Sequence, residues 1–410
     1  MKKTNFLGWT ITFKDETNDI EYSSEIVDLA IGQDVLSSIV MCTIKFSVDT
    51  SFLKYFVKQH TGTLTLINKL IYTDEPSEIF MIKLQSVSNV GSAMHREDDQ
   101  TQSNITLLPV RYMCAEGVKL MNSRVGGVYE DKTLKDIISD LYDQAKVDLP
   151  LKLEDPTNTN TYKSLMVRES SFIEAVRYLN QQFGLYDNLF LMFGETFSDE
   201  EFNWVINCVN KINREEVDLI LTNMQHRARG GEAKTIDERT YYTYIPLNIR
   251  NNFEQLVKKI PKLAKFTAFD DEKFWKRQDI PFAQTLKEMN FISANKQFDE
   301  LMEMDTKLYT GTSFDIKDYA AKDIMQKVGL SAFQVPDITI PNPFKLSHFK
   351  IGTPINFQSQ SMGFSDADVK LLVMGWLLRI KQGDGIGGGA AYQTTFKVRT
   401  AATSYLGNDN

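Results

Sequence analysis

The sequence predicts a multidomain α+β protein in which two small antiparallel β-barrels flank an α+β middle region. Three observations lead to this fold class. The chain has 410 residues, more than one hydrophobic core usually serves. Short segments that alternate apolar and polar residues dominate its first and last parts, whereas helical periodicity appears between them. Hydrophobic residues make up 42% and charged residues 24%, which is the balance of a globular protein with a sizeable core.

The first barrel is predicted over residues 1–110. Residues 9–14 alternate apolar and polar side chains with the period of two that is typical of a half-buried strand. Segments of the same kind follow at residues 39–48, 63–68, 79–84 and 104–108. Several short strands separated by turn residues favour a small barrel or sandwich.

The middle domain is predicted to be discontinuous, over residues 111–203 and 240–315. It begins with a helix whose apolar residues recur at the spacing of one helical face: Leu134, Ile137, Ile138, Leu141 and Tyr142. Helix-prone segments also occur at 253–260, before Pro261, and at 282–308. Residues 240–245 are aromatic and β-prone.

The strongest local signal in the chain is the start of a second helix. Ser171 and Glu174 fit a capping box, in which the side chain of each residue binds the backbone N–H of the other. Gly184 lies where a helix commonly ends in a left-handed residue. Residues 189–193 then predict a strand, so this segment is a helix–turn–strand unit of an α+β domain.

The second barrel is predicted over residues 204–239 and 316–403, followed by a flexible tail at 404–410. An apolar stretch lies within 202–212, a loop at 227–231 and a possible helix at 315–328. Three prolines, Pro336, Pro341 and Pro343, predict a short extended linker. The strands expected after it are residues 354–358, 369–380 and 391–399.

Composition limits the classes of partner. A net charge of −8 argues against a general nucleic-acid-binding surface, although it allows a duct through which nucleic acid slides without sticking. No apolar run reaches the roughly 18–20 residues needed to span a bilayer, and no apolar segment follows Lys2 and Lys3 as in a signal peptide. We therefore expect no stable membrane association. We also expect the three cysteines to be small buried apolar residues in a reducing cytoplasm: Cys42, Cys114 and Cys208.

No catalytic, cofactor-binding or metal-binding residues are predicted, and no cofactor is expected. The four histidines show no metal-ligand spacing: His60, His95, His226 and His348. The glycine-rich segment 383–389 precedes a strand and not a helix, so it indicates a hairpin tip and not a phosphate loop. The acidic clusters at 97–99 and 270–272 could supply paired carboxylates for glycoside hydrolysis, but runs of this kind are more often solvated loop surface.

The order of a β unit, an α+β insertion and a second β unit resembles the central hub proteins of contractile phage baseplates. It also resembles the hub portion of type VI secretion spike proteins. Residues 168–186 carry the resemblance most clearly, because their Glu-Ser-x-Phe, helix and Gly-Leu-Tyr sequence is common in this tail-hub superfamily. Residues 351–357, followed by 369–380, look like the closing barrel of such hubs.

The resemblance implies a structural virion protein of the tail baseplate, made in the host cytoplasm and without enzymatic activity. It implies a homotrimer whose two barrels per chain form a ring of six, which adapts a threefold central spike to a sixfold tail tube. The implied partners are the tail tube protein, the central spike protein and other baseplate proteins. DNA would pass only transiently through the lumen during genome ejection.

One hypothesis about the lumen and two alternative functions stay open. Three chains would carry a formal charge of −24, three times −8, and acidic residues facing the lumen would repel DNA. The same charge could equally be ordinary solubilising surface. The alternatives are a tail-associated peptidoglycan hydrolase and a hub in a cellular contractile injection machine, which genomic neighbours would distinguish from a phage.

Overall fold

We describe the fold from a computed structural model of the chain. The residues that it describes are 8–35, 37–69, 78–87, 94–95, 105–186, 190–195, 203–208, 219–222, 234–236, 239–243, 264–270, 274–280, 308–310, 334–341, 344–358, 369–383 and 391–402. The helices predicted at 253–260 and 315–328 lie outside these residues, as does the predicted loop at 227–231. The helix predicted at 282–308 also lies outside them except for Leu308, which is in a strand.

The N-terminal part, which we call the first β unit, is built of strands as predicted. They are β1 (Gly8–Asp15), β2 (Ile20–Tyr22), β3 (Ile26–Asp34), β4 (Met41–Asp49), β5 (Thr61–Lys69), β6 (Glu78–Ser86), β7 (Met94–His95) and β8 (Ile105–Cys114), with the short helices η1 (Thr50–Phe52) and α1 (Leu53–Phe56) between β4 and β5. Buried and exposed residues alternate along β4 and β8, because successive side chains of a strand point to opposite faces.

The middle region packs helices against short strands. Its elements are α2 (Ala115–Asn122), β9 (Val125–Tyr129), β10 (Lys132–Thr133), α3 (Leu134–Ala145), β11 (Leu151–Leu153), β12 (Thr161–Tyr162), β13 (Leu165–Ser170), α4 (Phe172–Phe183), β14 (Phe190–Glu195) and β15 (Asn203–Cys208). A separate three-stranded sheet contains β19 (Ala264–Asp270), β20 (Phe274–Ile280) and β21 (Leu308–Thr310). The α+β character predicted for this region is confirmed.

Both predicted helices form at the predicted residues. Helix α4 begins at the Ser171 cap, whose hydroxyl accepts from the Glu174 N–H at 3.3 Å, and it ends before Gly184, which has a φ of 65°. Helix α3 has its own capping box between Thr133 and Asp136, which the sequence reading did not single out. Its five predicted apolar residues are all buried.

The second β unit consists of strands that pair with one another late in the chain. They are β16 (Leu219–Thr222), β17 (Lys234–Ile236), β18 (Arg239–Thr243), β22 (Gln334–Ile340), β23 (Pro354–Gln358), β24 (Val369–Gly383) and β25 (Ala391–Ala402), together with the 3₁₀ helix η2 (Leu346–Phe349). Strands β24 and β25 pair antiparallel up to Gly383 opposite Ala391, which confirms the predicted hairpin around the glycine-rich segment. The tip between them lies outside the described residues.

The linker predicted around Pro336 is a strand. Residues 334–340 form β22, which pairs antiparallel with β25, and the register shifts between Val335 and Ile338. The shift falls at Pro336, which has no N–H to donate to a ladder and is tolerated at a bulge or on a strand with one partner. β25 is the only strand that pairs with β22 in the described part of the chain.

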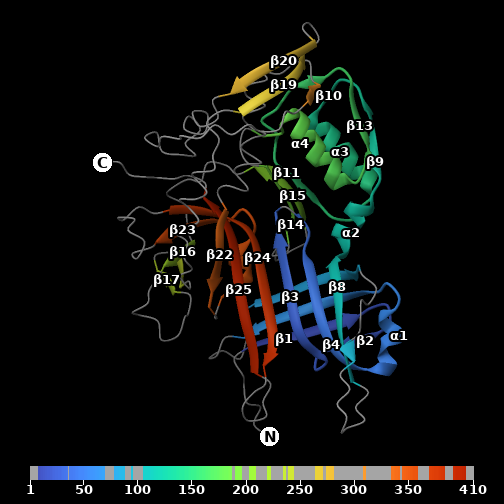
Figure 1. The fold of residues 1–410 in the computed structure, drawn as a ribbon, viewed down its shortest axis with the longest axis vertical. Coiled ribbons are helices and arrows are strands. Elements are labelled where there is room, and N and C mark those ends of the chain that lie inside the picture. The colour runs from blue at the N-terminus through green and yellow to red at the C-terminus, as the bar shows by residue number, and fades with distance from the viewer. Residues whose placement is uncertain are drawn as a thin grey trace.

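One mostly antiparallel sheet of 15 strands runs through both β units. Its main path is β17-β18-β16-β23-β24-β3-β4-β8-β6-β5-β1-β2, with β22 attached through β25. Strands β8, β4, β3, β24 and β25 lie side by side while β1 crosses behind them, so the sheet is curled like a half-barrel (Figure 1). The protein is thus mostly β with a few helices, and the described residues do not separate the two units into closed barrels.

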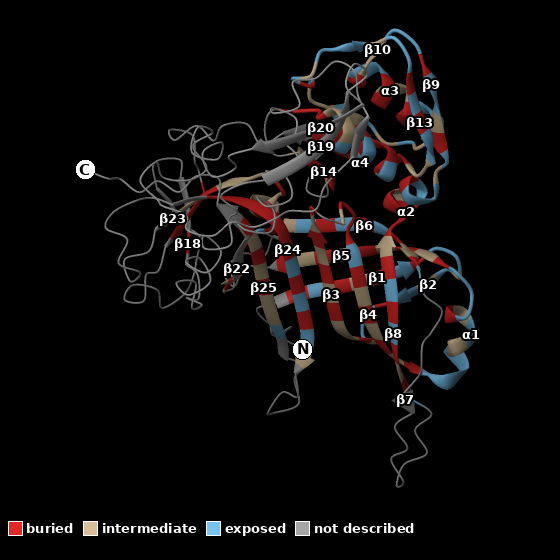
Figure 2. Ribbon diagram, turned by 45° about the horizontal axis from the view of Figure 1, so that its top comes forward, coloured by how far each residue is buried: buried red, intermediate tan, exposed pale blue. Residues whose placement is uncertain are grey.

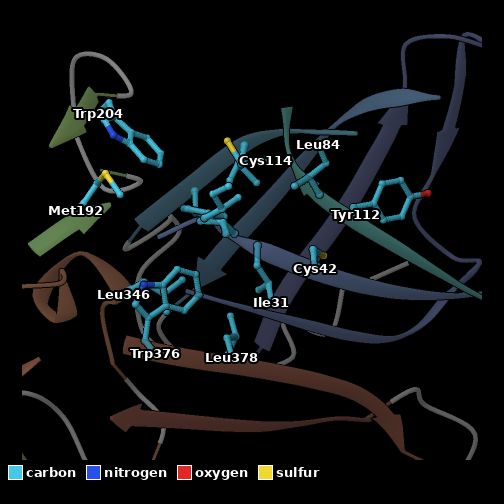
Figure 3. Packing of buried hydrophobic residues seen from close by; sticks show 14 of the residues in the cluster. Ile31, Cys42, Leu84, Tyr112, Cys114, Met192, Trp204, Leu346, Trp376 and Leu378 are labelled. Atoms are coloured by element: carbon cyan, nitrogen blue, oxygen red, sulfur yellow. The ribbon is translucent and has the colours of Figure 1, made fainter. Parts of the chain in front are cut away.

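A continuous core accompanies the continuous sheet. A single buried cluster includes residues of the first β unit, the middle region and the second β unit. Figure 3 shows this continuity, from Tyr112 and Ile31 to Leu378 and Trp376 of β24, with Trp204 of β15 nearby. The burial colours of Figure 2 show buried residues alternating with intermediate or exposed ones along β4, β8, most of β3 and residues 376–381 of β24. We conclude that the three regions fold as one body.

Two glycines allow the two β units to pair. In the ladder between β3 and β24, Gly375 lies opposite Asp34 and Leu377 lies opposite Gly32. A Cβ atom on Gly32 would lie 2.6 Å from the Trp376 carbonyl oxygen, and one on Gly375 would lie 2.7 Å from the Gln33 carbonyl oxygen. Because both contacts are with backbone atoms, a side chain at either position requires the strands to move apart.

Replacing Gly32 with alanine is expected to destabilise the protein. A Gly→Ala change at an unstrained position usually stabilises by about 0.4–1 kcal/mol, whereas overpacking of this kind costs about 1–3 kcal/mol. Urea unfolding should therefore show a lower free energy of unfolding for Gly32→Ala. The matched control is Ala30→Val on the same face of β3, which should change stability by less than about 0.5 kcal/mol. A Gly32→Ala variant as stable as the wild type would contradict the close approach of β3 and β24.

Candidate interaction surface

The first part of the candidate site is a set of contacts that hold η2 and the residues just before it. Leu346 and Ser347 donate their backbone N–H groups to the two carboxylate oxygens of Glu78 in β6, each at 2.7 Å. The Asn68 side chain of β5 donates to the Phe344 carbonyl at 2.8 Å. Phe344 also stacks on Phe396 of β25, with ring centroids 4.3 Å apart. The first β unit therefore supplies the hydrogen-bond partners of a segment of the second.

The second part of the site is a group of hydrogen bonds that fix the middle region to the turn between β3 and β4. Gln33 donates to the Gly194 carbonyl at 2.8 Å, and the Gly194 N–H donates to the Ser38 carbonyl at 3.1 Å. Arg177 of α4 donates to the Ser38 hydroxyl at 3.1 Å. A small apolar cluster joins the first β unit, the middle region and the second β unit: Val35, Leu191, Phe193, Val205, Ile351, Leu372 and Met374.

The third part of the candidate site is the outward face of five neighbouring strands, β8, β4, β3, β24 and β25, which lie at the front of Figure 1. Basic side chains gather on it from four of the five strands. We call the part of this surface that lies level with residues 28–34 of β3 the cationic face; its charged residues are Lys45 (β4), Arg111 (β8), Arg379 and Lys381 (β24), Lys397 and Arg399 (β25), with the carboxylates Asp28 and Asp34 (β3). Asp49, on the same side of β4, lies beyond the residues that pair with β3. All of these residues lie at positions that are not buried.

Strand register places these residues in rows across the sheet. One row runs Pro109–Lys45–Asp28–Lys381–Gln393, and the next runs Arg111–Thr43–Ala30–Arg379–Thr395. A third row runs Met113–Met41–Gly32–Leu377–Lys397. Directly opposed side chains on one face of an antiparallel pair have Cβ atoms about 4.5–5.5 Å apart, so the rows are contiguous surfaces.

Both carboxylates of the cationic face are bound by arginines. Arg379 donates to the two oxygens of Asp28 at 3.2 and 2.8 Å, and this hydrogen-bonded carboxylate raises the pKa of the Arg379 guanidinium. Arg399 forms an ion pair with Asp34. The remaining cations, Lys45, Arg111, Lys381 and Lys397, therefore give this face a positive charge.

A shallow depression of about 300 Å³ lies in the third row. Gly32 and Ala30 line it together with Met41 and Leu377, which are 49% and 44% exposed. Because Gly32 has no side chain, a gap is left between Met41 and Leu377. Lys397, Arg399 and Asp34 also line the depression. Because Arg399 and Asp34 form an ion pair, Lys397 leaves a positive charge beside the apolar middle.

The described histidines lie in separate places. His60 is buried, with its Nε2 2.8 Å from the Tyr112 hydroxyl and its Nδ1 3.1 Å from the Lys58 carbonyl. His348 lies in η2, with its Nδ1 2.8 Å from the Tyr242 hydroxyl of β18. His95 lies in β7, where its side chain is outside the described part, and His226 also lies outside it. Within the described ranges, no three His, Cys, Asp or Glu side chains gather as a metal site.

Two of the three cysteines are confirmed as buried apolar residues. Cys42 and Cys114 are buried and free. Burial raises the pKa of the Cys114 thiol to about 11 and raises that of Cys42 further, so both thiols stay protonated. The side chain of Cys208 in β15 is not described.

The acidic clusters singled out in the sequence fall almost entirely outside the described residues. Residues 97–99 lie outside the described part of the chain, and of the second cluster only Asp270, at the end of β19, lies within it. Among the described residues, no helix is long and apolar enough to cross a membrane.

The cationic face was not predicted from the sequence. Its signal is that charged side chains of one strand lie an even number of residues apart: Asp28 and Asp34 in β3, Arg379 and Lys381 in β24, and Lys397 and Arg399 in β25. This period marks an outward strand face, but it does not tell which strands lie side by side.

Comparisons with known proteins agree on the fold. Residues 38–223 match the family model described as the Bacteriophage PBS1 gene 109 protein. The whole chain resembles the tail protein from Neisseria meningitidis MC58, with a TM-score of 0.56, 10% identity and 96% of both chains covered. It also resembles the 43 kDa tail protein of prophage MuSo2 from Shewanella oneidensis, with a TM-score of 0.54 and 13% identity over 97% of this chain and 99% of that one.

A third similar structure is the PdpA–VgrG complex of Francisella, with a TM-score of 0.51 and 10% identity. The alignment covers 97% of this chain and 59% of that one. No curated protein matches the sequence. The chain therefore has a fold that is also found in tail proteins and in VgrG, as the predicted resemblance led us to expect.

The environment of His348 beside Tyr242 predicts that the stability of the protein depends on pH. Burial, and then the charge of Lys345, lower the pKa of His348 below its ordinary value of 6.5. Burial likewise raises the pKa of Tyr242 to about 12, so its hydroxyl stays protonated and can donate to the neutral imidazole. The His348 side chain therefore binds a proton more readily in the unfolded chain than in the folded one. It contributes stability above pH 6.5, and this contribution is lost as the pH falls through the lowered pKa of His348 in the folded protein.

Urea unfolding of the wild type and His348→Gln at pH 7.5 and pH 5.5 measures this contribution. The wild type should lose more stability than the variant on acidification, because the variant has no proton to bind at this position. The other three histidines are present in both proteins and cancel in the comparison. An equal loss of stability in both proteins would show that His348 is not the group responsible.

Proposed function

We propose that this chain is the structural hub of a contractile phage tail baseplate. In this proposal three copies form a ring that adapts a threefold central spike to a sixfold tail tube. The observation that supports it most is the similarity of the whole chain, and not of one domain, to two tail proteins of comparable length. The match to the PBS1 gene 109 family over residues 38–223 also favours a phage protein.

The continuous sheet supports the geometric part of the proposal. Each chain carries two β units joined by the β3–β24 ladder, so three chains would present six units at a spacing fixed within each chain. We propose that each unit acts as a small barrel in the ring. The domain hypothesis keeps the division at residues 1–110, 111–203 with 240–315, and 204–239 with 316–403, although β15 pairs with β11 and β14 of the middle region and β18 pairs with β16 and β17 of the second β unit.

The proposed partners are the homotrimer itself, the tail tube protein, the central spike protein and other baseplate proteins. The chain would act in the virion tail after synthesis in the host cytoplasm, without catalysis and without stable membrane association. DNA would pass transiently through the lumen. The acidic-lumen hypothesis requires that the cationic face point away from the lumen, because its surplus lysines would attract phosphate.

A hub in a cellular contractile injection machine is the second candidate. The similarity to VgrG, which occurs in a complex with PdpA in Francisella, favours keeping it. The two candidates share the trimeric ring and differ in the machine that contains it. Capsid and portal genes beside the coding sequence would favour the phage.

Light scattering of the purified chain across a range of concentrations tests the ring. We expect a stable species of three times the chain mass, either alone or after addition of the cognate spike protein, because the hub role requires three copies. The trimer should then bind the tube protein. A chain that stays monomeric in both conditions, and that clears peptidoglycan in a zymogram, would contradict the hub and favour the hydrolase alternative.

A further inference from the structure

Basic side chains are concentrated on one face of this molecule, although the chain as a whole is acidic. The chain has a net charge of −8, yet its cationic face carries six basic side chains and two carboxylates. The two carboxylates are each held by an arginine of the same face. Four cations on this face make no ion pair with any described residue: Lys45, Arg111, Lys381 and Lys397.

One of these four cations, Lys397, borders an apolar spot. Lys397 lies directly opposite Leu377 in the β24–β25 ladder, and Leu377 lies opposite Gly32 in the β3–β24 ladder. Met41 lies on the far side of Gly32. Two large apolar side chains at 49% and 44% exposure, with a glycine between them, form a depression of about 300 Å³, at the small end of ligand sites. It suits one inserted apolar side chain.

We propose that the cationic face binds an acidic segment of a partner protein. Carboxylates of that segment pair with Lys381, Lys397 and their neighbours, and one aliphatic side chain of the segment enters the depression over Gly32. This inference goes beyond the hub function, since the surface would have the same chemistry in any assembly.

The chemistry of the face favours a polypeptide over nucleic acid. The two arginines nearest the depression, Arg379 and Arg399, already bind Asp28 and Asp34, and those carboxylates repel phosphate. The rows across the five strands contain no aromatic side chain on which a base could stack. An apolar centre with charged groups beside it is instead typical of protein interfaces, which combine an apolar core with a polar rim.

The test uses the full chain and a fluorescein-labelled peptide with one leucine between two runs of four glutamates. Fluorescence anisotropy at low salt should show binding. A matched peptide with serine in place of leucine should bind on the order of tenfold more weakly, which is the effect of burying one leucine side chain.

Variants locate the binding on the cationic face. Lys381→Glu combined with Lys397→Glu should weaken binding of the leucine peptide on the order of tenfold, because two attractions become repulsions. Its matched control is Lys14→Glu, an exposed lysine of β1 away from this face. Leu377→Asp should abolish the preference for leucine over serine, whereas Met81→Asp, at the 62% exposed Met81 of β6, should preserve it. Thermal unfolding checks that each variant is folded.

Three results would overturn the proposal. The first is no binding of the leucine peptide up to about 1 mM, the weakest affinity expected of such a contact. The second is binding of a double-stranded DNA probe that the Lys381→Glu, Lys397→Glu variant loses, which would assign the face to nucleic acid. The third is loss of self-association in the same variant, which would make the face a contact between copies of this chain.

Discussion

The structure depends on the pairing of β3 with β24, two strands separated by more than 330 residues of sequence. One edge of β24 carries β23 beside residues 369–372 and β3 beside residues 375–381, while β25 pairs along the other edge. β24 is therefore the strand at which the two β units become one sheet. Gly32 and Gly375 make this possible, because any side chain there would contact the opposing backbone.

Other contacts gather around this ladder and make the chain one body. Glu78 and Asn68 hold the η2 segment, and Gln33 with Ser38 holds the middle region through Gly194 and Arg177. The hub that we propose would need this kind of rigidity, because it would set a fixed spacing between the two β units of each chain. The cationic face is a second consequence, because its rows exist only where strands of both units lie side by side.

Local structure could be predicted from the sequence and long-range pairing could not. The Ser171 capping box and the apolar face of 134–142 predicted α4 and α3, because both signals lie within a few residues. β3 was not singled out, since Gly32 and its aspartates are weak strand formers that only the close contact with β24 explains. The candidate site was missed for the same reason. Charged residues of β3, β24 and β25 lie an even number of positions apart within each strand, but the face is assembled from pairings between strands that this pattern does not encode.

Native-state hydrogen exchange tests most directly whether the two β units form one sheet. Amides of residues 28–34 and 375–381 should open with the same free energy and the same denaturant dependence, as members of one cooperative unit. Such a result would establish the β3–β24 ladder as part of the global fold. If the β24 amides open in a separate, less stable step while those of β3 and β4 stay protected, the two units fold independently and the single-body account is wrong.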